Sequence, residues 1–326
     1  MSSKPTIRDV AKLANVSVAT VSRVINNKGY VYEETKKMVL AAVEELGFEP
    51  NQLARSLTNH GSKMIGVIVP HFRNVFYSQL VEGIEKAALS YGYKTMLCNT
   101  RDEPQRELDY LRIFEQYNVD GIIVAANFQN RDELLKLDIP VVSVDHIISD
   151  EIPSISSNNY NGGKLAAKVL LEKGAKHVLL LRGPSFLLVT KERTKGFEEV
   201  FENYDATLSI HDFDLVEPDA NFIYEVLKNT PTIDGIFAMS DNLSLIALSC
   251  LEKLGKKVPD DVALVGFDDA PFAKWTNPAI STISQSVQYI GINAIEVLLR
   301  QINNEPLSNN HITIDVKFEE RDTTKK

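Results

Sequence analysis

The sequence predicts an α/β protein with an all-helical N-terminal helix-turn-helix head and two lobes built on doubly wound parallel sheets. Three observations predict this. The first 47 residues have apolar residues at helical spacing and no strand pattern. From Met64 onward, short β-branched apolar runs alternate with longer amphipathic segments, as in βαβ units. About ten such runs occur, more than one sheet comfortably holds, so two lobes are expected.

The head begins with two short helices joined by a tight turn. Thr6 is expected to cap a first helix whose apolar residues fall on one face. Asn15 tolerates the left-handed backbone of a turn, and Ser17 can cap a second helix over residues 18–26. This pattern predicts a helix-turn-helix motif.

A third helix is expected over residues 33–46, ending at Gly47. Its apolar positions are Val39, Leu40, Val43 and Leu46. Tyr32 stands at its start, where a Ser or Thr would have supplied a capping oxygen.

The second helix has an unusual outer face. Its inner face is Val21, Val24 and Ile25, and no acidic residue occurs on the other side. Short, methyl-bearing and hydroxylated side chains with one arginine are what a helix in the DNA major groove requires. The alternative interpretation of this face is a small helix that has only modest contact with solvent and no role in DNA binding. The expected DNA-facing residues are Ser17, Val18, Ala19, Thr20, Ser22, Arg23 and Asn26.

Charge is divided unevenly along the chain. Residues 1–60 hold eight Lys or Arg and six Asp or Glu, whereas residues 61–326 hold 27 and 38. The net charge of −9 alone argues against nucleic acid. A slightly basic head on an acidic body instead favours a protein that binds DNA through its head.

Composition excludes other classes. No apolar run of about eighteen residues is present, so no membrane span is expected. The N-terminus lacks the apolar segment of a secretory signal. Cys98 and Cys250 lie far apart in apolar runs, which fits buried thiols in the cytoplasm.

In the body, several predicted strands end in aspartate. Asp145, Asp241, Asp268 and Asp269 each follow an apolar run. Taken singly, such residues are often helix caps. Since ligands of open α/β sheets bind at the carboxyl ends of the strands, these residues together predict a polar cleft between two lobes.

The whole chain resembles the LacI/GalR family of bacterial transcription repressors. The resemblance is carried by TIRDVAKLANVSVATVSRVINN (6–27) and EETKKMVLAAVEELGFEPNQLARSL (33–57), and it continues through RTKGF (193–197) and VPDDVALVGFDDAP (258–271). It implies a head that binds operator DNA, a hinge helix that enters the minor groove, and a body with the periplasmic sugar-binding fold.

The resemblance also implies site residues. In the hinge segment PNQLARSL (50–57), Leu57 matches a leucine that wedges between base pairs, and an apolar wedge bends DNA. The other DNA-contacting residues implied are Thr6, Asn51, Ala54 and Arg55. Effector contacts are implied for the aromatic residues Phe76, Tyr77 and Phe213 and for Asp145, Arg193, Asp241 and Asp268. Aromatic faces together with carboxylates and arginine suit a sugar.

Two departures from the family pattern affect the cleft. Ser240 stands before Asp241 where the family often has Asn. The segment FLLV (186–189) is more apolar than a generic sugar loop and is interpreted as either a lid or packing.

The expected domains are the helix-turn-helix head (1–47), the hinge (48–60) and the effector-binding and dimerisation body (61–326). The N-lobe is expected to hold about 61–158 plus 287–316, and the C-lobe about 159–286 plus 317–326.

The predicted function is a homodimeric repressor of a carbohydrate operon that binds a near-palindromic operator and is controlled by a small sugar. Sucrose or a related fructose-containing sugar is favoured as the effector, with ribose as an alternative. A global regulator that uses a protein corepressor is a further alternative. An enzyme is not expected, because the sequence has none of the common nucleotide, protease or hydrolase motifs. No cofactor and no metal site are expected, since the six histidines show no ligand spacing.

Overall fold

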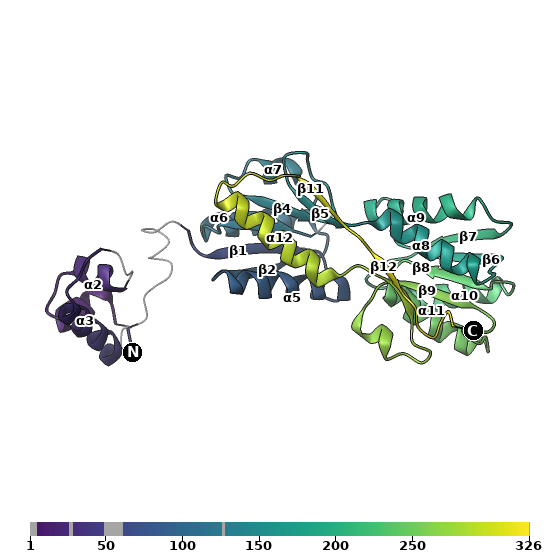
Figure 1. The fold of residues 1–326 in the computed structure, drawn as a ribbon, viewed down its shortest axis with the longest axis horizontal. Coiled ribbons are helices and arrows are strands. Elements are labelled where there is room, and N and C mark those ends of the chain that lie inside the picture. Colours follow the sequence, from purple (N-terminus) through teal and green to yellow (C-terminus); the bar gives the residue numbers. More distant parts are fainter. Residues whose placement is uncertain (1–4, 26–28, 49–60, 126–127, 326) are drawn as a thin grey trace. The chain divides into compact units, whose positions relative to one another are not determined.

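The computed structural model describes residues 5–25, 29–48, 61–125 and 128–325. The chain forms two compact units, Met1–Ser62 and Lys63–Lys326 (Figure 1). In the described ranges, no helix is both long and apolar enough to cross a membrane.

The first unit contains α1 (Ile7–Leu13), α2 (Val18–Ile25) and α3 (Glu33–Leu46) around a small apolar core. The Asp9 carboxylate accepts hydrogen bonds from the Thr6 N–H and hydroxyl, which closes the first turn of α1 and lowers the pKa of Asp9. Asn15 adopts φ 51° in the turn, and Gly47 ends α3 with φ 58°. These turns are as the sequence predicts, because each residue tolerates the left-handed region.

Two details of α3 follow from its packing. Val39 and Ala42 are its buried residues, whereas Leu40, one of its apolar positions, is 49% exposed. A helix of this length needs only a narrow apolar stripe to cover two short partners. Tyr32 occupies the N-cap position and makes no side-chain capping bond.

The body contains two six-stranded sheets, which confirms the predicted pair of doubly wound lobes. The N-lobe sheet is entirely parallel, with the order β11 (His311–Ile314), β5 (Ser154–Ser157), β4 (Val141–Val144), β3 (Gly121–Val124), β1 (Met64–Val69), β2 (Lys94–Asn99). The C-lobe sheet has the order β12 (Lys317–Glu319), β10 (Ser281–Ser284), β9 (Ala263–Asp268), β8 (Gly235–Ala238), β6 (His177–Arg182), β7 (Thr207–Asp212), and β12 alone is antiparallel among its described strands.

Helices cover both faces of each sheet. In the N-lobe, α5 (Val75–Ser90) and α12 (Val287–Ile302) pack on one face, and α6 (Pro104–Gln116) and α7 (Arg131–Leu135) on the other. In the C-lobe, the two pairs are α8 (Asn159–Glu172) with α9 (Leu188–Phe201), and α10 (Ala220–Asn229) with α11 (Asp241–Lys253); a short 3-10 helix η1 (Pro271–Lys274) follows β9. Cys98 and Cys250 are free, buried thiols.

The chain passes between the two sheets three times. The passages lie between β5 and α8, between β10 and α12, and between β11 and β12 (Figure 1). Each lobe is therefore made of segments distant in sequence, and the carboxyl ends of β1 and β4 in one lobe and β8 and β9 in the other line a common cavity.

Glycines let α8 and α9 approach at backbone distance. A Cβ on Gly163 would overlap the carbonyl oxygen of Arg193, and a Cβ on Gly196 would overlap the carbonyl oxygen of Tyr160. This close contact sets the position of α9, and with it the side chain of Arg193.

Candidate functional site

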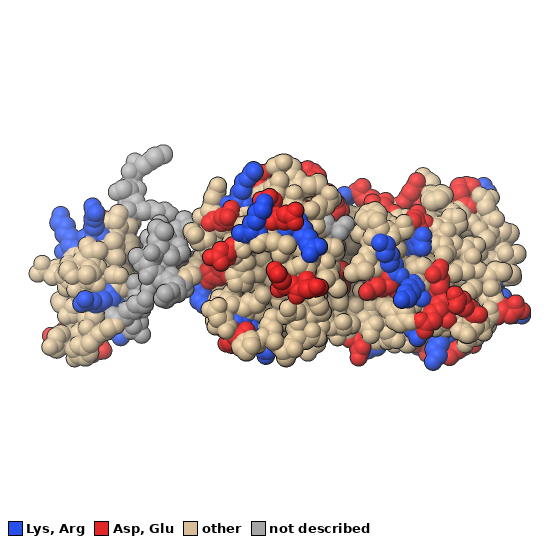
Figure 2. Space-filling view, turned by 90° about the horizontal axis from the view of Figure 1, so that it is seen from above, with Lys and Arg blue, Asp and Glu red and all other residues tan. Residues whose placement is uncertain are grey.

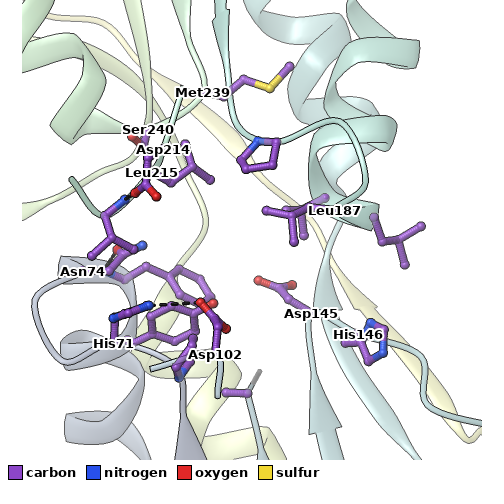
Figure 3. A pocket seen from close by; sticks show the side chains of 18 of the residues that line it. His71, Asn74, Asp102, Asp145, His146, Leu187, Asp214, Leu215, Met239 and Ser240 are labelled. Carbon is purple, nitrogen blue, oxygen red and sulfur yellow. Dashed lines mark hydrogen bonds and ion pairs between the residues drawn. The ribbon is translucent and has the colours of Figure 1, made fainter. Parts of the chain in front are cut away.

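A cavity of about 290 Å³ lies between the lobes of the body. Figure 3 shows side chains from both lobes pointing into it, including Asp145 from one lobe and Leu187 from the other. Its volume is near the lower end of the range for ligand pockets, which suits a small molecule.

Two carboxylates from opposite lobes face this cavity. Asp145 follows β4 with φ 53°, and Asp268 ends β9 with φ 108°. The Ser157 N–H donates to Asp145 Oδ1 over 3.2 Å, and the Gln285 amide donates to Asp268 Oδ1 over 2.5 Å. The positive φ angles turn both side chains away from the direction of their strands at a conformational cost, as is common at functional sites.

Burial raises the pKa of both carboxyl groups. The pKa of Asp145 rises to about 6 and that of Asp268 to about 7, although the nearby Arg193 guanidinium lowers both. Desolvation therefore outweighs the attraction of the single arginine.

Arg193 also lines the cavity, close enough to act on both carboxylates, and is 5% exposed. Its Nε donates to Asn159 Oδ1 over 2.8 Å, and its Nη1 donates to the Met239 carbonyl oxygen over 2.7 Å. The guanidinium carbon lies 3.6 Å from the centre of the Phe267 ring. The planar group is thus fixed in orientation, while burial lowers its pKa.

Aromatic residues contribute the N-lobe side of the cavity. Phe76 and Tyr77 lie in the first turn of α5, with their rings edge to face at 5.2 Å. The Asn74 side chain caps this helix by accepting from the Phe76 N–H at 3.0 Å. Burial, followed by the nearby Asp145 charge, raises the pKa of Tyr77 above its usual range.

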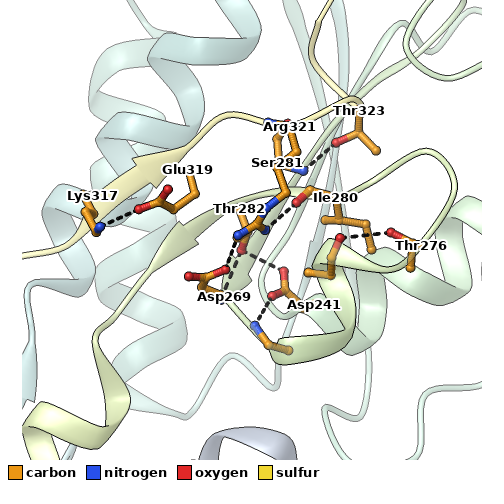
Figure 4. Close-up of polar contacts among 12 residues, drawn as sticks. Asp241, Asp269, Thr276, Ile280, Ser281, Thr282, Lys317, Glu319, Arg321 and Thr323 are labelled. Carbon is orange, nitrogen blue, oxygen red and sulfur yellow. Dashed lines mark hydrogen bonds and ion pairs between the residues drawn. The ribbon is translucent and has the colours of Figure 1, made fainter.

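Two expected effector contacts lie outside the cavity lining. Asp241 is 1% exposed, and its carboxylate accepts from the Ala270 N–H at 2.7 Å and the Thr282 hydroxyl at 2.8 Å (Figure 4). These two bonds stabilise the turn after β9. Burial raises the pKa of Asp241 well above its ordinary value. Ser240, one residue earlier, lines the cavity instead and caps α11 through its hydroxyl.

Phe213 is the second of these residues outside the cavity lining. It is buried in the C-lobe core against Phe222, with ring centroids 5.2 Å apart. The residues that follow it, Asp214, Leu215 and Val216, line the cavity. In both cases, residues next to the expected one line the cavity.

Sequence reasoning missed several lining residues at the ends of β1, β2 and β4. His71 and Asp102 form a hydrogen-bonded pair at 3.0 Å (Figure 3), and His146 follows Asp145. Burial lowers the pKa of His146. The signal available was their position directly after predicted strands, the same signal that identified Asp145.

The apolar segment 186–189 lines the cavity over its whole length. Phe186 is 66% exposed, so this segment is a surface of the cavity and not part of the lobe's core. Together with Leu215 and Val216 it gives the C-lobe side an apolar wall.

The described residues contain no cluster of His, Cys, Asp or Glu that could hold a metal ion. The cavity can therefore be described as a binding site with hydrogen-bonding acceptors from both lobes, one fixed guanidinium, aromatic rings and an apolar wall.

In the head, the outer face of α2 is accessible. Ser17, Val18, Ala19 and Arg23 are exposed, whereas Thr20 and Ser22 are half-buried. The Ser17 hydroxyl accepts from the Thr20 N–H at 3.1 Å and so caps the helix as predicted. Val18 exposes 42% of its surface although it is apolar. Thr6 is exposed at the start of α1.

The remaining expected DNA contacts lie outside the described residues. They are Asn26, Asn51, Ala54, Arg55 and Leu57. On the visible face, Figure 2 shows Lys and Arg side chains on the head and groups of acidic side chains on the C-lobe, in line with the uneven charge of the sequence.

Comparison with known proteins gives matches over both units. Residues 6–51 match the bacterial regulatory proteins of the lacI family, and residues 62–322 match the periplasmic binding proteins and sugar binding domain of the LacI family. The ribose operon repressor of Halalkalibacterium halodurans is 39% identical over 98% of this chain and 97% of its own length. The sucrose operon repressor of Streptococcus mutans is 34% identical over 94% of this chain and 95% of its own.

Among solved structures, a periplasmic binding protein/LacI transcriptional regulator from Alkaliphilus metalliredigens, in complex with D-xylulofuranose, superposes with a TM-score of 0.75. It is 34% identical and covers 81% of this chain and 100% of its own.

Proposed function

Because this chain belongs to the LacI family of bacterial regulatory proteins, we propose that it represses a carbohydrate-utilisation operon in the cytoplasm and leaves the operator when a sugar fills the cavity between its lobes. Its family consists of DNA-binding transcriptional repressors with a sugar-binding domain, not of enzymes. The observation that carries the proposal is that one chain holds both an acid-free, exposed recognition face on α2 and a two-lobed cavity with carboxylates from each lobe.

The DNA contacts proposed are the exposed residues of α2 together with Thr6 and the hinge. Val18 and Ala19 supply methyl groups for thymine, and Arg23 supplies a charge for phosphate or guanine. Two heads of a homodimer would bind the two halves of a near-palindromic operator. Leu57 would act as the minor-groove wedge, with Asn51, Ala54 and Arg55 beside it.

The effector proposed is sucrose or a related fructose-containing sugar. The sucrose operon repressor of Streptococcus mutans and the bound ketose, D-xylulofuranose, of the Alkaliphilus structure support it. Ribose is the second candidate, because a ribose operon repressor is 39% identical to this chain. In the cavity, Asp145, Asp268 and Arg193 are the proposed partners of sugar hydroxyls, and Phe76 and Tyr77 of the ring face.

The test is an anisotropy titration of the full chain on its promoter DNA. Operator affinity should fall when sucrose, fructose or ribose is added, and no other protein should be required. A sugar lowers operator affinity only by binding the DNA-free state more tightly than the DNA-bound state, typically with about 1–3 kcal/mol of coupling. Sequence-specific binding that no sugar changes would contradict the effector part of the proposal.

Substitution of Val18 tests the recognition face. Val18→Ser should weaken binding to the natural operator by about tenfold or more, since it removes methyl contacts to bases. Non-specific binding should stay unchanged, and the exposed Glu45→Gln on α3 is the matched control. Equal affinity of Val18→Ser and the unsubstituted protein for the operator would rule out the assigned face.

A further inference from the structure

We infer that the cavity between the lobes selects an uncharged sugar and rejects the phosphate esters of the same sugars. This inference rests on the proposed function, because it concerns which sugars the effector site accepts. It is carried by the charges, hydrogen bonds and helix ends that line the cavity.

Acidic groups outnumber basic groups around the cavity. Arg193 is the one arginine or lysine among its described lining residues, which also include two histidines. Four carboxylates line the same space: Asp102, Asp145, Asp214 and Asp268. A dianionic phosphate would therefore enter a field of the same sign in a partly desolvated site, where such repulsion is strong.

The guanidinium of Arg193 already donates two hydrogen bonds within the protein. Arg193 donates to Asn159 and to the Met239 carbonyl oxygen and stacks on the Phe267 ring. A bidentate contact through Nε and Nη2 would require breaking the bond to Asn159, so a phosphate would have to be held end-on, through Nη1 and Nη2, by this single positive group among four carboxylates.

The histidines do not compensate. His71 is bonded to Asp102 at 3.0 Å, so any charge it acquires is offset by its own partner. His146 is partly buried, and burial together with Arg131 lowers its pKa, which favours the neutral ring. Neither residue offers an unopposed positive charge to a phosphate.

At two of the three helix N-termini whose residues line the cavity, a side chain already accepts a hydrogen bond from one of the terminal N–H groups. Asn74 caps α5 by accepting from the Phe76 N–H, and Ser240 caps α11 by accepting from the Leu243 N–H. The start of α9 has Leu187 at its N-cap, which has no capping oxygen. This third terminus is surrounded by the apolar segment 186–189, where a phosphate would lose its hydration.

An uncharged sugar fits the same set of lining residues. Its hydroxyl groups can donate to Asp145 and Asp268 from both lobes, and its C–H face can lie on the apolar wall of the C-lobe. The carboxylates that repel phosphate are thus the acceptors that a neutral polyol needs.

The experiment compares matched pairs by calorimetry on the full chain: D-fructose with fructose 6-phosphate, D-ribose with ribose 5-phosphate, and sucrose with sucrose 6-phosphate. At least one neutral sugar should bind, and its phosphate ester should have a Kd at least about 100-fold higher. A phosphate ester that binds as tightly as its parent sugar overturns the inference but leaves sugar control in place. Absence of binding by every member overturns the proposed effector function and the inference with it.

A variant separates charge from shape. Asp214→Asn keeps the Oδ1 acceptor that bonds the N–H groups of Val216 and Glu217 but removes one negative charge from the cavity. The ratio of the two Kd values, phosphate ester over neutral sugar, should fall by about threefold or more. Asp205→Asn, an exposed change of the same charge outside the cavity lining, should leave the ratio unchanged. Equal ratios in the two variants would show that charge does not exclude the ester.

Discussion

At the residue scale, the cavity depends on carboxylates held in unfavourable conditions. Asp145 and Asp268 combine positive φ angles with raised pKa values, to about 6 and about 7. The folded protein tolerates both because Gln285, Ser157 and the neighbouring Arg193 offset part of the cost. A ligand that donates hydrogen bonds to these groups would relieve the rest.

Asp268→Asn should therefore stabilise the sugar-free protein in a pH-dependent way. An unfolded aspartate ionises near pH 4, whereas Asp268 in the folded state ionises near pH 7. Between these values the folded state retains a proton that the unfolded state has lost, so the contribution of Asp268 to stability falls as pH rises from about 4 to 7 and is constant above that.

The measurement is the difference in Tm between variant and unsubstituted protein at pH 5 and pH 8. This difference should be larger at pH 8, by about 2 °C or more. Asp205→Asn, the same change at an exposed position outside the cavity lining, is the control. If the Tm difference is the same at both pH values, ionisation of Asp268 does not destabilise the folded protein.

At the element scale, the pair α8 and α9 positions the only arginine among the described lining residues of the cavity. Gly163 and Gly196 face backbone carbonyls of the opposite helix with no room for a Cβ. Asn159, at the start of α8, accepts the bond from Arg193 Nε on α9. The glycines in NGGK (161–164) and RTKGF (193–197) thus allow the two helices to pack closely. This packing positions Arg193 in the cavity lining.

Gly196→Ala should destabilise the protein by about 1–3 kcal/mol, because the added methyl group would overlap the Tyr160 carbonyl oxygen and force the helices apart. Urea unfolding measures this loss, and sugar affinity should fall with it as Arg193 moves. Lys191→Ala, an exposed change in the same helix, is the control. A Gly196→Ala protein of normal stability would disprove the close contact.

In the body as a whole, the two lobes are joined by the three passages of the chain and by an ion pair between loops. Arg73, in the loop after β1, forms an ion pair with Glu217, in the loop after β7. Both side chains are mostly exposed, so the pair contributes little to stability, but it connects the two lobes directly beside the lining residues Asn74 and Val216.

Charge reversal tests whether this ion pair favours the ligand-bound arrangement. Arg73→Glu and Glu217→Arg should each weaken sugar binding by about two- to fivefold, and the double variant should recover most of the loss. The loss should shrink in high salt, since exposed charges are screened. Single variants with unchanged Kd, or a double variant no better than either single, would exclude the role.

The sequence alone was enough to predict the helical head, the face of α2 that lacks acidic residues, and the two α/β lobes. Capping residues, helical spacing and short β-branched runs are local signals. It also located the turns that line the cavity, since the carboxyl ends of parallel strands meet at one edge. The cavity is lined by five of the residues for which the family resemblance implies effector contacts: Asp145, Arg193, Asp268, Phe76 and Tyr77.

Only the tertiary structure decided which residue of each turn points into the cavity. Asp241 turns inward because the Ala270 N–H and the Thr282 hydroxyl, both distant in sequence, satisfy its carboxylate, and Phe213 turns inward because Phe222 covers it. The apolar segment 186–189 has no such partner in the core and is left at the cavity surface. The partners of Asp241 lie 29 and 41 residues away along the chain, and Phe222 reaches Phe213 because α10 folds onto the C-lobe core, so no local pattern could reveal these directions.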